Sequence, residues 1–293
     1  MKKKSKSLNP KMSKELKNKV VLVTGGSGSI GSAIVKELLN YQVKAVRVFD
    51  IDEYGLFKLK RSLNDKRLRF LLGNILDKER IEMACSNVDI IIHTAAIKNI
   101  EISEFNPIET IDININGTVN LIKTCMKTKP KKFLNLSTDK AALPATLYGT
   151  TKQLSEKLTS WAGMHLEPIK FASVRLGNVI ETRGNVFEIW NEELQNNQKL
   201  SITVPNMKRY YFKVDEAVEF ILNCLPKINE GEIFIPKMKS YTIKELADKI
   251  SKNQKIIGLR QGEKMEEILI TDMEKKHAKE LNDMWVICDY CLN

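Results

Sequence analysis

Short apolar runs alternate with amphipathic segments through the first 176 residues. The runs at 19–24, 45–49, 68–72, 88–93, 132–136 and 171–176 have the length and branched side chains of buried strands. The segments between them carry apolar residues at helical spacing. Because strands that alternate with helices form parallel sheets covered by helices, the pattern predicts an α/β protein with a Rossmann-type, doubly wound parallel sheet over residues 20–176.

Beyond residue 176 the regular alternation gives way to short mixed pieces. Helices are predicted at 186–196, 214–225 and 242–252, and strands at 200–204, 209–212, 232–235 and 256–259. We therefore expect residues 177–293 to form mainly a smaller α/β lobe that binds a substrate, from which one strand and one helix can return to the first domain. Ligands of doubly wound sheets lie beyond the carboxyl ends of the strands, so the site is expected there.

Positive charge is concentrated in residues 1–19, which hold eight lysines and one glutamate and supply +7 of the net charge of +11. The segment has no hydrophobic run, so it is not a secretory signal, and we expect a disordered basic tail. Contact with an anionic membrane or with nucleic acid is the alternative for this tail. The chain has no run of 18 apolar residues, so no transmembrane helix and a soluble, cytoplasmic protein are expected.

Five scattered cysteines suit a reducing compartment better than a disulfide framework. Cys288-x-x-Cys291 has no second cysteine pair and no neighbouring histidine to complete a zinc site. A structural role for this pair, and no bound metal, are therefore expected.

A glycine turn joins the first strand to the first helix. Gly25, Gly28 and Gly31 allow a tight turn, close approach of the backbone to a pyrophosphate, and close packing of the helix on the strand. Asp50 ends the second strand, nineteen residues after Gly31, where a carboxylate binds the ribose hydroxyls of adenosine. Together they predict a dinucleotide site.

The acid at the second strand also bears on the choice of cofactor. A carboxylate at Asp50 repels a 2′-phosphate, and Ile51 follows where an arginine would receive one, so NAD is preferred over NADP. Lys58, Lys60 and Arg61 lie within reach in sequence and keep NADP open. A solvent-facing Asp50 that only closes the strand is the structural alternative.

Polar residues follow the strand at 132–136 and lead into a helix that carries Tyr148 and Lys152 four residues apart, on one face. An ammonium beside a phenol favours the phenolate, so Lys152 is expected to lower the pKa of Tyr148 and prepare it to take a hydroxyl proton. Such pairs also occur by chance on helix surfaces. Elsewhere, His93 is interpreted as a packed core residue, and Asn114 and Asn116 as structural.

With the glycine turn, Asp50, Thr138, Tyr148 and Lys152 in this order, the chain resembles the extended short-chain dehydrogenase/reductase family. The segments HTAAIKNIEISEFNP, STDKAALPATLYGTTK, VRLGNVIETRGNV and GLRQGEK are similar to those of nucleotide-sugar 4,6-dehydratases that act on UDP-N-acetylglucosamine and invert carbon 5. The resemblance covers about residues 20–270. Relatives that retain carbon 5 carry Thr-Asp-Glu in place of Thr-Asp-Lys, and 4-epimerases usually lack that acid and base.

The resemblance implies five catalytic residues: Thr138, Asp139, Lys140, Tyr148 and Lys152. Oxidation at carbon 4 acidifies the hydrogen on carbon 5, Lys140 removes that proton, and Asp139 protonates the departing 6-hydroxyl. The hydride then returns to carbon 6, so NAD or NADP is tightly bound and recycled. This chemistry needs a neutral lysine and a protonated aspartic acid, so burial has to oppose their pairing. A structural ion pair that caps the loop is the alternative.

The resemblance also extends the binding sites. Expected cofactor contacts are Gly25, Ser27, Gly28, Ser29, Ile30, Gly31, Asp50, Asn74, Ile75, Ala95, Lys98, Tyr148, Lys152 and Val179. Expected substrate contacts are Lys98, Asn178, Arg183, Arg260 and Glu263, with Arg209 as a candidate that could equally be an exposed arginine of the lobe. Arginine suits a diphosphate because its guanidinium donates two parallel hydrogen bonds. The family's tendency to assemble implies a homo-oligomer.

Two other functions compete with a lyase of polysaccharide biosynthesis that forms a UDP-4-keto-6-deoxy sugar. A UDP-sugar 4-epimerase would use Tyr148 and Lys152 without Asp139 or Lys140, so the presence of that pair argues against it. A non-catalytic dinucleotide- or nucleic-acid-binding protein would commonly lose Tyr148 and Lys152, which are both intact. Fold alone does not decide among these functions.

Overall fold

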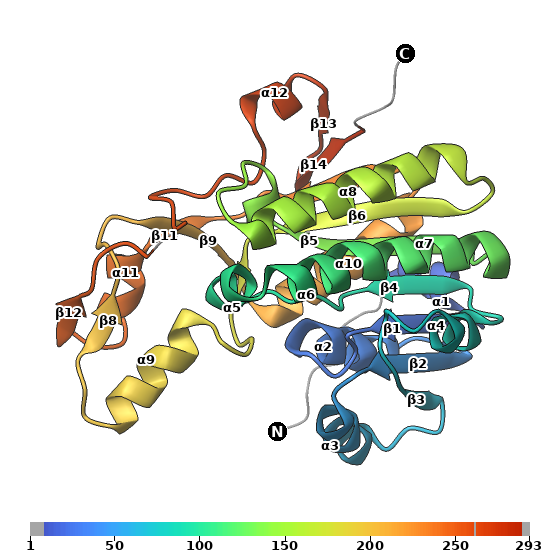
Figure 1. The fold of residues 1–293 in the computed structure, drawn as a ribbon, viewed down its shortest axis with the longest axis horizontal. Coiled ribbons are helices and arrows are strands. Elements are labelled where there is room, and N and C mark those ends of the chain that lie inside the picture. The colour runs from blue at the N-terminus through green and yellow to red at the C-terminus, as the bar shows by residue number, and fades with distance from the viewer. Residues whose placement is uncertain (1–8, 261, 289–293) are drawn as a thin grey trace.

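The computed structural model describes residues 9–260 and 262–288 (Figure 1). Within them, a nine-stranded sheet has the order β13-β14-β10-β6-β5-β4-β1-β2-β3. Neighbours from β10 to β3 run parallel, whereas β14 lies antiparallel to both β10 and β13. Its strands are β1 (Val20–Thr24), β2 (Ala45–Asp50), β3 (Leu68–Leu72), β4 (Ile90–His93), β5 (Lys132–Thr138), β6 (Lys170–Leu176), β10 (Glu232–Pro236), β13 (Ala278–Glu280) and β14 (Met284–Ile287). The predicted doubly wound α/β fold is confirmed.

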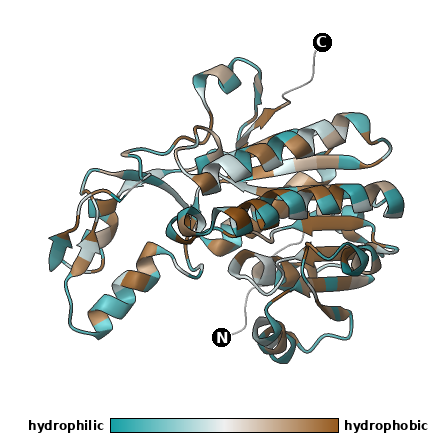
Figure 2. Cartoon of the chain, in the orientation of Figure 1, coloured by the Kyte–Doolittle hydropathy of each residue, from teal (hydrophilic) through white to brown (hydrophobic). Residues whose placement is uncertain are grey.

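Two hydrophobic cores lie on the two faces of this sheet because successive strand residues point to opposite sides. In β1, Val21 and Val23 belong to one core, whereas Val20 and Leu22 belong to the other. Figure 2 shows hydrophobic residues gathered along the central strands. The helices that cover the sheet are α2 (Ser29–Leu38), α3 (Glu53–Leu63), α4 (Lys78–Cys85), α7 (Gly117–Thr128), α8 (Leu147–His165) and α10 (Val214–Cys224).

The C-terminal part of the chain crosses back to the main sheet. Strand β10 pairs with β6, and α10 packs against α2. Strands β14 and β13 then extend the edge, and the short helix α12 (Asp272–Lys275) precedes them. The sheet is therefore built from both ends of the chain.

The rest of the C-terminal half forms a small lobe beside the sheet, at the left of Figure 1. It contains two small sheets, β11-β9-β7 and β12-β8, around the buried Trp190. The Trp190 indole N–H donates to the carbonyl of Ser201 at 2.8 Å, which satisfies its polar atom. The lobe's elements are β7 (Asn178–Val179), α9 (Val186–Gln195), β8 (Leu200–Ile202), β9 (Lys208–Phe212), β11 (Ser240–Thr242), α11 (Ile243–Asp248) and β12 (Gln254–Ile256).

The structure corrects the expectation of a disordered tail for part of residues 1–19. A helix, α1 (Pro10–Leu16), begins there and its Asn9 cap accepts a hydrogen bond from Lys11. Met12 and Leu16, four residues apart, are fully buried in the core of the main sheet. Two apolar residues among many lysines suffice for docking when both lie on one helical face. Residues 1–8 lie outside the described part.

Several predicted boundaries were also wrong. The long helix expected to end near residue 127 is broken into α5 (Ile100–Phe105), α6 (Pro107–Ile111), a π-helical turn (Asp112–Asn116) and α7, because Pro107 cannot continue α5. The strand expected at 256–259 is β12, which ends at Ile256. The helix expected over 242–252 is α11, which ends at Asp248.

The cysteines of the described residues differ in state. Cys85, Cys125 and Cys224 are buried free thiols. Cys288, directly after β14, is disulfide-bonded, whereas the cysteine pattern predicted reduced cysteines. Cys291 lies outside the described residues. No helix of the described chain is both long enough and apolar enough to cross a membrane.

Candidate active site

The end of β5 and the start of α8 bring together four of the five predicted catalytic residues, Thr138, Asp139, Lys140 and Tyr148. β5 ends at Thr138, and a 3-10 turn (Asp139–Ala141) follows it directly. The Thr146 hydroxyl then caps α8 by accepting from the Gly149 N–H at 3.1 Å. A Cβ at Gly149 would lie 2.5 Å from the Lys140 carbonyl oxygen, so only glycine lets the first turn of α8 approach the 3-10 turn.

The centre of this site is a buried charge pair. The Lys140 Nζ lies 2.9 Å from Asp139 Oδ1, and the Thr138 hydroxyl donates to the same oxygen at 3.0 Å. Asp139 is fully buried, yet its other oxygen, Oδ2, has no hydrogen-bond partner within the described residues. A buried carboxylate oxygen without a partner is costly, and a catalytic role is one of the few explanations for such a group.

Lys140 is held as an ammonium in the ligand-free protein. Burial lowers its pKa, but the carboxylates of Asp139 and Glu267 outweigh burial and raise the pKa above its ordinary value. Burial thus opposes the pairing with Asp139, as expected, but does not overcome it in this state of the protein. Any step that needs a neutral Lys140 requires its proton to move first.

Tyr148 and Lys152 also differ from the expected pair. Burial raises the pKa of Tyr148, although the Lys140 charge and a hydrogen bond with Thr138 act in the opposite direction. The expected lowering of this pKa by Lys152 is thus wrong: burial dominates, and the cation that acts on the phenol is Lys140. Lys152 is itself buried, which lowers its pKa to about 8 against the field of Glu156.

His93 is a packed core residue, as expected. One ring nitrogen is hydrogen-bonded to the Thr24 hydroxyl at 2.7 Å, and the other to the Thr118 hydroxyl at 3.3 Å. Burial, followed by the charge of Lys152, lowers its pKa to about 3, so the ring is neutral. It anchors the end of β4 below the site.

Asn114 shows why a helix can carry an asparagine at this position. It lies in the π-helical turn, where its Oδ1 accepts from the Ile97 N–H at 2.8 Å and its Nδ2 donates to the Ile97 carbonyl and the Thr151 hydroxyl at 3.0 Å each. Asn116 instead bonds Asp112 on the surface. The π-helical turn thus ties the loop after β4 to α8.

The glycine turn has the shape of a dinucleotide cradle. Gly25 has a φ of +65°, and a Cβ at Gly31 would lie 2.1 Å from the Gly25 carbonyl oxygen. Gly28 begins α2 without a side-chain cap, so the first N–H groups of that helix can face an anion. Asp50 closes the cradle by accepting from the Ser27 N–H at 2.9 Å. These residues fit a dinucleotide pyrophosphate and ribose.

Other expected cofactor residues line this end of the sheet. Ala95 follows β4 and packs so closely that a Cβ on Gly25 would lie 2.7 Å from its backbone. Asn74 follows β3 and accepts from the Leu76 N–H at 2.9 Å. Ile75 and Val179 are buried. Ser29 contacts the segment after β7, and Ile30 packs against the core of the main sheet.

Lys98 and Arg183 converge on the cradle from distant parts of the chain. The Arg183 N–H donates to the Ser29 hydroxyl at 2.9 Å, and its guanidinium lies 3.6 Å from Asp52. Lys98 donates to the Arg183 carbonyl at 2.7 Å, and burial lowers the pKa of Lys98. Two cations therefore stand over the helix N-terminus, where a diphosphate would lie.

The remaining predicted substrate residues have other surroundings. Asn178 donates to the Tyr210 carbonyl at 3.2 Å. Arg260 and Glu263 bond each other through the Arg260 N–H at 3.0 Å, in an exposed turn of the lobe. Arg209 is buried, unlike an exposed lobe arginine, and donates to the Lys208 carbonyl at 2.8 Å. Within the described chain, no hydrogen bond or ion pair joins Arg209, Arg260 or Glu263 to Lys98 or Arg183.

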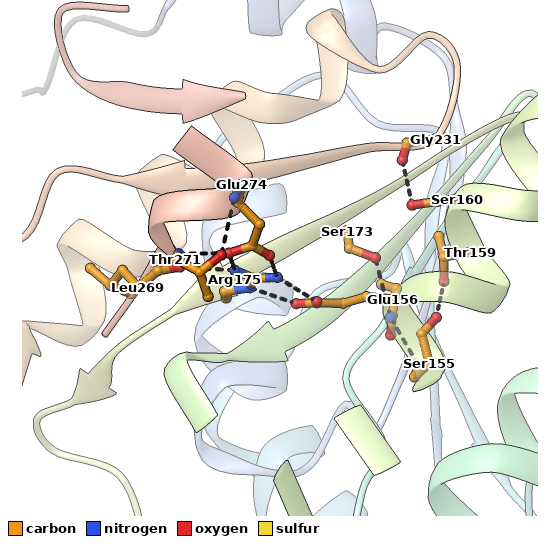
Figure 3. Close-up of polar contacts among 11 residues, drawn as sticks. Ser155, Glu156, Thr159, Ser160, Ser173, Arg175, Gly231, Leu269, Thr271 and Glu274 are labelled. Carbon is orange, nitrogen blue, oxygen red and sulfur yellow. Dashed lines mark hydrogen bonds and ion pairs between the residues drawn. The ribbon is translucent and has the colours of Figure 1, made fainter. Parts of the chain in front are cut away.

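A second buried charge cluster lies behind α8 and was missed in the sequence. Arg175 of β6 forms two hydrogen bonds to Glu156, at 3.0 and 2.8 Å, and two to Glu274, at 3.1 and 2.8 Å. It also donates to the Leu269 carbonyl at 2.9 Å. Figure 3 shows Arg175 between the Glu156 side chain of α8 and the C-terminal segment that carries Glu274. An arginine within an apolar strand gave no sequence signal because its partners lie on other elements.

Together, the parallel sheet, the glycine cradle and the polar residues at the end of β5 define an extended short-chain dehydrogenase/reductase of the type that includes nucleotide-sugar dehydratases and epimerases. The chain belongs to the polysaccharide biosynthesis protein family, whose model matches residues 21–289.

Relatives with different names are similar in sequence to this chain over most of their length. A protein of Methanocaldococcus jannaschii named an uncharacterized membrane protein is 39% identical over 94% of this chain and 87% of its own. An inverting UDP-N-acetylglucosamine 4,6-dehydratase of Campylobacter jejuni is 38% identical over 92% of this chain and 82% of its own. A UDP-glucose 4-epimerase of Rickettsia bellii is 33% identical over 92% and 83%.

A solved structure agrees closely with this fold. The crystal structure of Pen from Bacillus thuringiensis has a TM-score of 0.89 and 35% identity, and covers 93% of this chain and 90% of its own. The match therefore extends beyond the main sheet into the lobe.

Proposed function

We propose that this protein is a UDP-N-acetylglucosamine 4,6-dehydratase that inverts carbon 5. The observation that carries the proposal is the buried Asp139–Lys140 pair beside Thr138 and Tyr148. An epimerase has no step that uses a second acid and base at carbons 5 and 6, whereas loss of water requires both. The 38% identity to a relative that carries this name supports the same substrate.

A nicotinamide dinucleotide fits the cradle of Gly25, Gly28 and Gly31, with Asp50 at the ribose. When bound, it supplies a reversible hydride acceptor, so that no external oxidant is needed. Tyr148 takes the proton of the 4-hydroxyl as the phenolate, so the positive charges of Lys140 and Lys152 have to offset the burial that raises its pKa in the ligand-free protein. Lys98 and Arg183 hold the diphosphate of the UDP-sugar by charge and hydrogen bonding.

The ion pair itself offers a route to the protonation states that elimination requires. Transfer of one proton across the 2.9 Å bond from Lys140 to Asp139 yields a neutral amine and a carboxylic acid together. A substrate that displaces water lowers the local polarity and favours this neutral pair over the charged one. Lys140 then removes the carbon 5 proton while Asp139 protonates the departing 6-hydroxyl.

We also propose NAD as the preferred dinucleotide. Asp50 faces the cradle through Ser27, and the cation expected for a 2′-phosphate is absent from position 51. Of the cations nearby, Arg47 donates to the carbonyls of Ala84 and Ser86 at 2.6 and 2.7 Å. Replacing Asp50→Ser with Ile51→Arg is expected to shift binding from NAD towards NADP in calorimetric titrations. An unchanged preference would place cofactor selection elsewhere.

The test of the reaction is to incubate the purified protein, without added cofactor, with UDP-N-acetylglucosamine in heavy water and to follow products by NMR and mass spectrometry. We expect a product that has lost one water and carries deuterium at carbon 5, with the configuration at that carbon inverted. An unchanged mass with UDP-N-acetylgalactosamine appearing would favour a 4-epimerase. No reaction even with NAD added would contradict the proposed substrate.

A further inference from the structure

The loop of residues 142–146 joins the 3-10 turn that carries Lys140 to the helix that carries Tyr148. Its Pro144 side chain lies against Gly149 of α8, where an added Cβ would approach it to 3.3 Å. The loop is therefore packed against one of the two elements that it connects. Because packed elements move together, a displacement of this loop shifts Lys140 relative to Tyr148.

Two segments that are distant in the sequence hold this loop. The Glu104 carboxylate of α5 accepts from the N–H of Leu147, the first residue of α8, at 2.7 Å. The Lys264 ammonium donates to the Leu143 carbonyl. Glu104 thus links the loop to a helix that packs on α8, whereas Lys264 links it to the segment that leaves the lobe after β12.

Lys264 directly follows a turn, here named the nucleotide turn, that carries the predicted substrate contacts Arg260 and Glu263. The Glu263 N–H donates to the Arg260 carbonyl at 3.1 Å, and the Arg260 N–H donates to the Glu263 carboxylate at 3.0 Å. Gly262 in this turn has a φ of +78°, which favours glycine, and an added Cβ would lie 2.7 Å from the Thr146 methyl group. The nucleotide turn and the loop are therefore in contact through Gly262 as well as through Lys264.

The Lys264 ammonium is itself anchored within its own segment. It lies 3.6 Å from Oε2 of Glu267, whose side chain is 5% exposed, and the Lys264 side chain is 26% exposed. The backbone of the segment is bonded to β9, since the Lys208 N–H donates to the Met265 carbonyl at 2.9 Å. A hydrogen bond from an ammonium is stronger than one between neutral groups. Lys264 is therefore a fixed link between the nucleotide turn and the loop, unlike a solvated surface lysine.

We propose that Lys264 is a positioning residue that couples binding at the nucleotide turn to the placement of Lys140 and Tyr148. A nucleotide that holds the turn also fixes Lys264, and through the Leu143 carbonyl it fixes the loop. Binding energy from a part of the substrate that does not react then orders the reacting groups. The proposal rests on the proposed function, because it takes UDP as the nucleotide and Lys140 and Tyr148 as the reacting groups.

Hydrogen exchange of the loop measures this coupling without turnover. The holoenzyme is compared with and without UDP, and exchange in peptides that cover residues 142–147 is followed by mass spectrometry. We expect UDP to slow this exchange about tenfold in wild type and to leave it unchanged in Lys264→Met, with dissociation constants for UDP that differ by less than about threefold. Lys275→Met removes a lysine that pairs with the exposed Asp272, so it is the matched control and is expected to behave as wild type.

The kinetics of dehydration give a second readout, which a general loss of stability would not reproduce. In Lys264→Met, kcat is expected to fall about 10–100-fold while KM for UDP-N-acetylglucosamine changes by less than about threefold. Lys264→Arg keeps a charged donor for the Leu143 carbonyl and is expected to restore part of kcat. Glu104→Ala loosens the same loop without touching the nucleotide turn, so kcat is expected to fall while protection of the loop by UDP remains.

The outcomes separate this inference from the proposed function. If UDP binds without slowing exchange of the loop, or slows it equally in wild type and Lys264→Met, the coupling is overturned whatever the enzyme's reaction. Protection that depends on Lys264, in a protein whose wild type forms no dehydrated product, would support the coupling and reject the dehydratase. Failure of UDP to bind would overturn both.

A second variant tests the coupling if Lys264→Met does not fold. Thr146→Ser removes the methyl group that lies against Gly262 and keeps the hydroxyl that caps α8. Protection of the loop by UDP is expected to weaken in this variant, and full protection would overturn the proposal.

Discussion

The molecule contains two buried charge clusters that share a composition and differ in completeness. Around Arg175, two carboxylates occupy both sides of one guanidinium, and a carbonyl takes a further donor. Around Lys140, Asp139 alone is paired with the ammonium, and its Oδ2 has no hydrogen-bond partner in the described chain. A closed network stabilises a single arrangement, whereas an incomplete one leaves groups free to exchange protons with a substrate.

The choice of cation explains this difference. Arginine has a rigid planar head that donates in several directions and does not lose its proton, so it can join α8, β6 and the C-terminal segment permanently. Lysine is a point charge whose pKa responds to its surroundings. Arg175 is thus a structural cation, whereas Lys140 is a titratable one.

The largest expected effect separates the structural cluster from an ordinary ion pair. Arg175→Met leaves Glu156 and Glu274 without their cation, and Glu156 is almost fully buried. We expect the free energy of unfolding in urea at pH 7 to fall by about 3–5 kcal/mol. Lys127→Met, which removes an exposed pair with Glu82, is the control and should cost about 1 kcal/mol or less. Equal losses in the two variants would contradict the comparison.

The reactive cluster should respond in rate. Lys140→Met removes the proposed base, so dehydration of UDP-N-acetylglucosamine is expected to fall about 10²–10⁴-fold while slow reduction of the bound dinucleotide persists. Product formation by NMR and reduced cofactor by absorbance give the two rates separately. Dehydration at the wild-type rate would end the assignment of Lys140.

Replacing Lys152 is expected to stabilise the protein, whereas replacing Arg175 destabilises it. Its pKa is lowered to about 8 by burial, so the unfolded chain binds more protons between pH 8 and 10.5 and stability from this group rises with pH in that window. Below pH 8 the buried ammonium costs about 3 kcal/mol. Lys152→Met is therefore expected to stabilise the cofactor-free protein by that order at pH 7, with the gain vanishing near pH 10.5. A destabilised variant at pH 7 would contradict this account.

The smallest effect concerns Glu274. Burial raises its pKa, but the hydrogen bonds and charge of Arg175 outweigh burial and lower it, so its contribution is present above the ordinary value of 4.5 and lost as pH falls through the folded-state pKa. We expect the free energy of unfolding of the wild type to exceed that of Glu274→Gln by on the order of 1 kcal/mol at pH 7 and by less at pH 3. Asp272→Asn, at an exposed acid of the same helix, is the control for urea unfolding. A constant difference across pH would argue against the pairing.

Much of the fold could be predicted because its signals are local. The glycine turn, Asp50 and the apolar runs each depend on a few consecutive residues, and the structure places them at the predicted sheet and cradle. Helix α1 was missed because lysines hide the two apolar residues that bury it. Strands β13 and β14 were missed because they are short and pair at a sheet edge supplied by β10.

For the site, the sequence by itself determined which groups are present: Thr138, Asp139 and Lys140 after a strand, and Tyr148 and Lys152 one helical turn apart. Only the tertiary structure decided their charge states, because burial and partners from distant segments set each pKa. The charge of Glu267 acts on Lys140 from more than a hundred residues away, and Arg175 meets Glu274 across 99 positions. No spacing pattern encodes such contacts, since they arise from how the lobe and the C-terminal strands return to the sheet.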